Sequence, residues 1–226
     1  MKTQLKFLTA AVLLTAGSSF AQTAGTWMVR AGVHKIAPSV TSSCLSAPDF
    51  GDGPFGCTKS DVTSDTQLAG GITYMLTNNV AIDVPVALPF KHKIVGAGAL
   101  AGAGDLGEVQ ALPFTVFVQY RFMQPTDKFR PYIGLGATYA YFFNEQGSGR
   151  LTAVTNPGGA PTKLTVDAKF VLTPQIGATL ALNDKWFIDM SYSKSQMSTV
   201  TNLSTGQHMN MDLDPASYSI AVGYKF

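Results

Sequence analysis

The sequence is poor in charge and, beyond its N-terminus, has no long apolar run. Only 13% of its 226 residues are charged, about half the share of an ordinary soluble domain, and 46% are hydrophobic. This balance excludes disorder and does not suit a well-solvated cytosolic surface. No later apolar run approaches the roughly 18 to 20 residues of a spanning helix, which excludes insertion by helices. The 22 Gly, 14 Phe and 8 Tyr residues favour β structure.

The N-terminus has the order of a secretory signal peptide. Lys2 and Lys6 precede an apolar stretch, and small residues stand before the predicted cleavage point after Ala21. We therefore expect residues 1–21 to be removed and residues 22–226 to form one domain. A buried N-terminal helix would leave the charge order unexplained. The removed segment contains two of the 16 basic residues and none of the 14 acidic ones, so the mature chain is formally neutral. Its net charge therefore gives no reason to expect a nucleic-acid partner.

Two cysteines, Cys44 and Cys57, lie in one stretch rich in Ser, Pro, Gly and Asp. In an exported chain such a pair predicts a disulfide that closes a loop. A metal site is not expected, because two thiols without a cluster of His or carboxylate side chains do not complete a tetrahedral shell. No cofactor motif is present either.

The rest of the chain alternates in hydrophobicity with a period of two. This pattern predicts an all-β fold, an eight-stranded antiparallel transmembrane barrel. The expected strands cover about 26–37, 65–77, 80–91, 109–123, 130–143, 166–182 and 185–199, with a last strand that ends at Phe226. A soluble lipocalin-like barrel would turn the apolar face inward, and periodicity alone does not choose between the two.

Connections alternate between very short and long. Tight turns follow the second, fourth and sixth strands, whereas the long connections cover about 38–64, 92–108, 144–165 and 200–212. Outer-membrane barrels have short periplasmic turns and long extracellular loops, so both ends of the mature chain are expected on the periplasmic side of a Gram-negative outer membrane. An interfacial aromatic girdle is expected there from Trp27, Tyr74, Trp186, Tyr224 and Phe226.

Four inward-facing charges are expected in the periplasmic half of the lumen. They are Arg30, Asp83, Arg121 and Asp189, and two pairs of opposite charge at one depth should close the floor. The same pairing would also serve a purely structural barrel. Above the floor the predicted lining is apolar and consists of Ala87, Pro89, Ala111, Pro113, Phe117, Ala140 and Phe142. Such a cavity accepts an apolar guest but offers it no downward route.

Three prolines suggest a way out through the wall. Pro85, Pro89 and Pro113 lie on neighbouring expected strands, and each lacks a backbone donor for the ladder between them. The sequence therefore predicts a lateral gate at or beside the strand 80–91. Proline at a bulge that merely bends the wall is the alternative.

Several motifs resemble the outer membrane protein W (OmpW) family over nearly all of the mature chain. They are TQL at 66–68 with TYMLT at 73–77, PFKHKI at 89–94, KFRPYIG at 128–134 and GYKF at 223–226. The resemblance implies an eight-stranded barrel that passes small hydrophobic molecules across the outer membrane and releases them sideways. The two cysteines in the first outer loop depart from the family pattern.

Two other classes of function are an enzyme and a barrel without transport activity. An enzyme is not expected, because His34, His92 and His208 lie at outer strand ends or in loops and no GxSxG or HExxH pattern occurs. A structural or receptor barrel whose extracellular loops carry the function is the alternative to transport. Expected partners are membrane lipid, lipopolysaccharide, small apolar molecules and the barrel-assembly machinery through Phe226, with the barrel a monomer.

Overall fold

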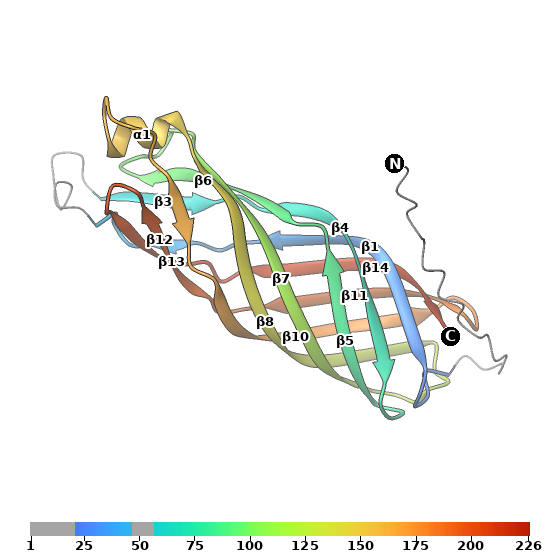
Figure 1. The fold of residues 1–226 in the computed structure, drawn as a ribbon. Coiled ribbons are helices and arrows are strands. Elements are labelled where there is room, and N and C mark those ends of the chain that lie inside the picture. The colour runs from blue at the N-terminus through green and yellow to red at the C-terminus, as the bar shows by residue number, and fades with distance from the viewer. Residues whose placement is uncertain (1–20, 47–56) are drawn as a thin grey trace, which may run out of the picture.

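The computed structural model describes residues 21–46 and 57–226, so the predicted signal peptide lies outside the described residues except for Ala21. The chain forms a closed antiparallel barrel of eight strand positions (Figure 1), as predicted. These are β1 (Trp27–Ala37), β4 (Asp65–Met75), β5 (Val80–Ala87) with β6 (Phe90–Gly98), β7 (Asp105–Arg121), β8 (Phe129–Gly147), β10 (Lys169–Ala181), β11 (Trp186–Lys194) and β14 (Ala216–Lys225). β14 pairs with β1, and the pairing of β7 with β8 closes the sheet.

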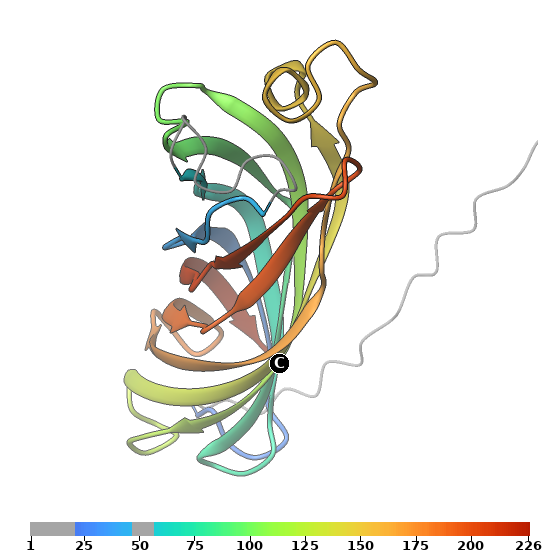
Figure 2. The ribbon, with the colours of Figure 1, turned by 90° about the vertical axis from the view of Figure 1, so that its left-hand side faces the viewer.

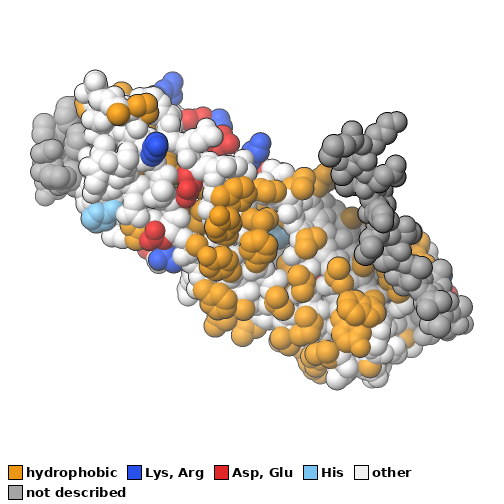
Figure 3. Space-filling model, viewed as in Figure 1, with side chains coloured by type: hydrophobic (Ala, Val, Ile, Leu, Met, Phe, Trp, Pro, Cys, Tyr) orange, Lys and Arg blue, Asp and Glu red, His pale blue; other side chains and the backbone are white. Residues whose placement is uncertain are grey.

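Large apolar side chains cover the outside of the barrel wall. In β1 the exposed Val29 and Val33 alternate with residues that face inward, among them the buried Met28 and Ile36, because successive side chains of a strand point to opposite faces. Figure 3 shows the resulting apolar surface along the barrel, with most visible charges gathered towards the end that carries α1. An apolar exterior with all ladder bonds internal suits lipid. The soluble alternative with an inward apolar face is therefore wrong.

The end of the barrel opposite the short turns carries an outer extension (Figures 1 and 2). We use this name for β2 (Thr41–Ser42), β3 (Thr58–Val62), β9 (Leu164–Val166), β12 (Ser198–Leu203), β13 (His208–Asp212) and the helix α1 (Gly149–Thr155). β2, β13, β12 and β9 form a second sheet in that order, and β3 pairs with β6. Within the described ranges no helix is long and apolar enough to cross a membrane.

The outer connections are more regular than the long loops predicted from the sequence. β6 and β7 pair as far out as Val95 and Asp105, so most of the expected loop 92–108 is strand, and β12 and β13 make a hairpin across the expected loop 200–212. These segments bury a shared apolar cluster that includes Leu106, Leu164 and Leu203. Their Gly, Ser and Thr content resembles loop composition, and tertiary packing overrides it.

Candidate functional site

An ion pair at the periplasmic end of the lumen joins β1 to β5. Arg30 Nη1 and Nη2 donate to the two carboxylate oxygens of Asp83 at 2.6 and 2.9 Å, which is a bidentate, charge-assisted arrangement. Thr73 of β4 bonds to both partners. Gly71 leaves room for this guanidinium, because a Cβ there would lie 2.8 Å from Arg30 Nη2. Three adjacent strands are thereby tied together inside the barrel.

The other two predicted floor charges take different roles. Asp189 lies 3.8 Å from Arg30 Nε and accepts from the Tyr132 hydroxyl and from Thr179 Oγ1. Among the described residues Arg121 forms no ion pair, so two separate pairs of opposite charge are not what the structure contains. The Arg121 guanidinium lies 4.7 Å from the centroid of the Tyr132 ring instead, where a cation and the ring face attract.

The hydrogen-bond partners of Arg121 are neutral side chains and not the carboxylate that the sequence predicted. Its Nη atoms donate to Gln22, Gln119 and Thr179 at 2.8 to 3.1 Å, and its Nε has no partner within the described residues. Sequence reasoning assigned it a carboxylate partner because it matched charges by depth alone. Register and side-chain reach place Asp83 and Asp189 nearer to Arg30.

Arg130 is a floor residue that the sequence reasoning missed. It is fully buried at the start of β8 and donates to the backbone oxygens of Gln22, Asn78 and Phe122. Arg130 lies two residues before the inward Tyr132, so strand alternation places both side chains on the lumen face. The KFRPYIG segment was used only for the family resemblance, and this alternation was not applied to Arg130. Arg130 ties the chain before β1 to two periplasmic turns, so it closes the floor from below.

Above the floor lies a cavity of about 120 Å³ with a mostly apolar lining. Of the predicted lining residues, Ala87, Ala111, Pro113, Phe117, Ala140 and Phe142 border it, together with Pro85. Pro89 does not, so its prediction as a lining residue is wrong, and Phe90 takes the inward place. The missed lining residues include His34 and His92, together with Met197, Met211 and Leu213 near the outer extension.

Hydroxyl groups on the cavity wall bond to one another. Thr115, Thr138, Thr173 and Ser195 come from β7, β8, β10 and the segment after β11, and successive oxygens are 2.9, 2.8 and 2.8 Å apart. Each buried hydroxyl therefore has a partner inside the protein. An apolar molecule bound beside these hydroxyls would leave none of them without a hydrogen bond. This part of the lining therefore adds no desolvation penalty to the binding of an apolar molecule.

The ladder of the barrel wall has a gap beside the cavity. β5 pairs with β7 only as far as Asp83 opposite Phe117, and β6 resumes at Phe90 opposite Ala111. Residues 84–89 and 112–116, all of them described, have no β5–β7 or β6–β7 pairing between them. The register also shifts by one residue across the gap, and such a shift turns side chains to the other face. This shift is why Phe90 points inward, against the simple alternation through residues 80–91.

The gap has prolines on both of its sides. Pro85 and Pro89 lie on the β5–β6 side and Pro113 on the β7 side, and none of them carries a backbone N–H. The outward side chains beside it are apolar, with Val86 58% and Phe114 56% exposed. An apolar cavity thus borders a stretch of wall without ladder bonds, and that stretch faces lipid.

Asp65, at the outer end of β4, connects to β6 through its side chain. Its carboxylate accepts from Lys91 N at 2.7 Å and from Gln67 Nε2 at 2.7 Å. A side chain therefore links β4 to β6 just above the gap.

The predicted interfacial aromatics lie together at the end with the short turns. The rings of Trp27 and Tyr74 are tilted against each other with centroids 4.6 Å apart, and Tyr224 lies between Trp186 and Phe226 at 5.1 and 4.9 Å. Phe226 N donates to Trp27 O, which joins the two groups across the closing strands. This row marks the expected level of the inner lipid headgroups.

The two cysteines form the predicted disulfide, Cys44–Cys57. Leu45 N donates to Thr58 O beside it, so the bridge and the backbone bond together fasten the edge of β3 to the chain after β2. Residues 47–56, which the bridge encloses, lie outside the described part. Across residues 21–46 and 57–226 no three His, Cys, Asp or Glu side chains gather closely enough to hold a metal ion.

Comparisons with known proteins agree on one family. The model of the OmpW family matches residues 23–226. Outer membrane protein W of Vibrio cholerae serotype O1 is 34% identical over the whole of both chains. The crystal structure of the outer membrane protein OprG from Pseudomonas aeruginosa superimposes with a TM-score of 0.81 at 28% identity, covering 92% of this chain and 99% of that one. The solid-state NMR structure of outer membrane protein AlkL shares the fold, with a TM-score of 0.67 at 20% identity over 97% of each chain.

Proposed function

The chain belongs to the OmpW family of outer-membrane barrels, and from this we propose that it is a passive channel for small apolar molecules. In the proposal the guest occupies the lumen cavity from the outside and leaves sideways through the barrel wall. The relatives are named as outer-membrane proteins, so this barrel lies in the lipid of a Gram-negative outer membrane. The proposal concerns the cargo and its route.

The composition of the cavity supports an apolar cargo. Its lining is dominated by Ala, Val, Pro, Phe and Met side chains, and the Thr115 to Ser195 hydroxyls are already bonded to one another. Pockets of this kind gain affinity from removing apolar surface from water. A strongly polar cargo would lose its hydration in this mostly apolar cavity. Among the described lining residues, His34 Nε2 is the one buried polar side-chain atom without a hydrogen-bond partner.

The floor supports a sideways exit over a downward one. Arg30, Asp83, Arg121, Arg130 and Asp189 are all at most about one-tenth exposed at their side chains and bond across the lumen. An apolar molecule would have to break several buried polar contacts to pass. We infer a floor that resists both the cargo and the free flow of ions, consistent with the narrow interior of eight-stranded barrels.

The ladder gap is the observation that carries the proposal. Residues 84–89 and 112–116 already lack the hydrogen bonds that close the rest of the wall, so parting them there costs no ladder bond. The cavity lies directly behind, lined by Pro85, Ala87 and Pro113. A guest leaving between these segments enters lipid, where its apolar surface stays out of water. In the proposal Pro85, Pro89 and Pro113 keep the gate open by withholding donors.

A transport assay in cells with an intact outer membrane tests the function. A phospholipid bilayer hardly hinders an apolar solute, so the asymmetric membrane of a deletion strain is the proper barrier. We expect faster uptake of a short linear alkane with this protein than without any barrel or with an unrelated eight-stranded barrel, and little single-channel conductance in planar bilayers. Uptake no faster than with the unrelated barrel would favour a receptor role for the outer extension.

The gate is tested by restoring backbone donors. Pro89→Val with Pro113→Val supplies an N–H on each side of the gap and should slow alkane uptake while the barrel still folds. The matched control is Pro174→Val, because Pro174 is an exposed residue inside the continuous β10–β8 ladder. Equal uptake by the double variant and the control would remove this gap from the route.

Two further parts of the proposal concern chemistry and partners. We infer no enzymatic activity, since the relatives are named as outer membrane proteins. In the described part of the chain, His34 Nε2 has no hydrogen-bond partner, and His92 Nδ1 bonds to the Thr63 backbone oxygen, which is not a nucleophile. We also propose contact with lipopolysaccharide through exposed Lys35 and Lys194, which lie at the outer ends of β1 and β11, and recognition of Phe226 by the barrel-assembly machinery.

A further inference from the structure

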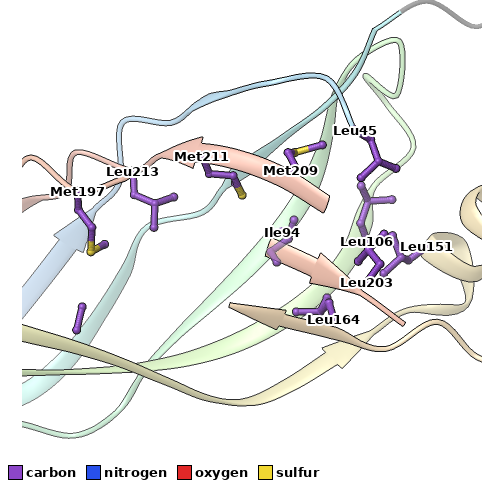
Figure 4. Close-up of a cluster of buried hydrophobic side chains, with 11 residues drawn as sticks. Leu45, Ile94, Leu106, Leu151, Leu164, Met197, Leu203, Met209, Met211 and Leu213 are labelled. Carbon is purple, nitrogen blue, oxygen red and sulfur yellow. The ribbon is translucent and has the colours of Figure 1, made fainter. Parts of the chain in front are cut away.

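A second apolar pocket lies in the outer extension, separate from the lumen cavity. Leu45, Leu100, Leu106, Leu151 and Leu203 contribute to its lining. Figure 4 shows these leucines, apart from Leu100, gathered towards α1, while Met197 and Leu213 lie at the barrel side of the same cluster. The cluster is thus a continuous row of apolar side chains that runs from the extension down to the lumen cavity.

A thin partition separates the two pockets. Ile94 and Thr201 border both of them, Met209 borders only the outer pocket and Met211 only the lumen cavity. Met209 Sδ and Met211 Sδ lie 3.0 and 3.9 Å from the same Ser60 hydroxyl, and Thr201 Oγ1 lies 3.3 Å from Met211 Sδ. The partition is therefore about one layer of side chains thick.

The partition is built from side chains that move easily. Methionine is unbranched, has three rotatable bonds and adapts to irregular apolar surroundings. The hydrogen bonds that the two thioethers accept here come from hydroxyl groups, and a thioether sulfur is a weak acceptor. Rotation of Met209 and Met211 would join the pockets without breaking a backbone ladder bond. Two leucines or two valines in their place would make a stiffer partition, because their side chains have fewer rotatable bonds.

The disulfide holds one wall of the outer pocket. Leu45 and Thr58 both border it, each is the neighbour of a bridged cysteine, and Leu45 N bonds to Thr58 O. A covalent bridge here keeps that wall in place while the methionines move.

We propose that the outer pocket is the first binding site for the apolar cargo, and that Met209 and Met211 form a deformable constriction through which slim, unbranched chains pass into the lumen cavity. This deepens the proposed function and rests on it. The constriction selects by cross-section, because a branched or cyclic molecule must displace both methionines and their neighbours Ile94 and Thr201 at once.

Blocking the partition tests the route. Thr201→Trp places a large side chain between the pockets, whereas Val200→Trp lies on the same strand with its side chain on the opposite face. In deletion cells we expect alkane uptake to fall to the level of barrel-free cells with Thr201→Trp and to persist with Val200→Trp. Normal uptake by a folded Thr201→Trp variant overturns the inference alone. No difference between the unmodified protein and barrel-free cells overturns the proposed function as well.

Widening the partition keeps the inference testable if the tryptophan variant does not fold. Met209→Ala with Met211→Ala should raise the uptake of a branched alkane relative to a linear one. Met209→Leu with Met211→Leu nearly conserves the volume and should leave that ratio low. An unchanged ratio in the alanine variant would show that the cargo does not pass this constriction.

Discussion

The Arg30–Asp83 pair allows a quantitative test of the floor. Asp83 is fully buried and accepts two charge-assisted bonds from Arg30, besides the contact with Thr73. Asp83→Ala leaves the guanidinium with one carboxylate, Asp189, at 3.8 Å. Removing one partner of a buried pair costs about 3–5 kcal/mol because the other charge stays uncompensated. We expect a loss of this size in the free energy of unfolding.

Asp189→Ala provides an internal comparison. Its contacts to Arg30, Tyr132 and Thr179 are all 3.2 Å or longer, so its removal leaves the bidentate pair intact and should cost less, about 1–3 kcal/mol. Asp184→Ala, in an exposed turn, is the matched surface control and should change stability by no more than about 0.5 kcal/mol.

Urea titration of folding into lipid vesicles measures all three variants. Trp27 and Trp186 are half-exposed on the lipid side of the barrel, so their fluorescence reports insertion directly. A cost below about 1 kcal/mol for Asp83→Ala, or a larger cost for Asp189→Ala, would refute the reasoning that the short bidentate pair holds the floor together.

Three smaller predictions follow from contacts elsewhere. Gly177→Ala drives a Cβ into the Tyr132 ring and should cost about 1–3 kcal/mol in the same titration. Cys44→Ser with Cys57→Ser removes a bridge of sequence separation 13 worth roughly 3 kcal/mol by loop entropy, so hydrogen exchange should quicken in β2 and β3 while the barrel strands stay protected. Thr138→Val interrupts the hydroxyl chain and should destabilise the barrel by about 1 kcal/mol, again read by urea.

Local pattern accounts for what sequence reasoning found. The alternation along β1, with Trp27, Val29 and Val33 outward and Arg30 inward, follows from the period of a strand and needs no knowledge of its neighbours. The same rule placed Phe117 and Ala140 inside the lumen. The rule failed at Phe90, because a register shift is a property of two paired strands and leaves no trace in the alternation of one.

The sequence did not show which buried charges pair with one another, or that a partition divides the two pockets. Arg121 and Asp189 were expected at the same depth in the lumen, yet the Arg121 guanidinium lies over the Tyr132 ring and Asp189 contacts Arg30. Which side chains can reach one another across a closed lumen depends on the register of every strand. Composition marked residues 200–212 as loop, and only packing against Leu45 and Ile94 turned the methionines there into a buried partition.

The sequence by itself determined the class of fold, the division of most strands into an apolar and a polar face, the end that bears the long connections and the pairing of the two cysteines, because each depends on neighbours along the chain or on composition. Tertiary structure alone decided the register shift across the gap in the ladder, which charges meet and that two pockets share a wall. These features depend on how distant segments are registered against one another, and the energies that set such contacts arise only when the barrel closes.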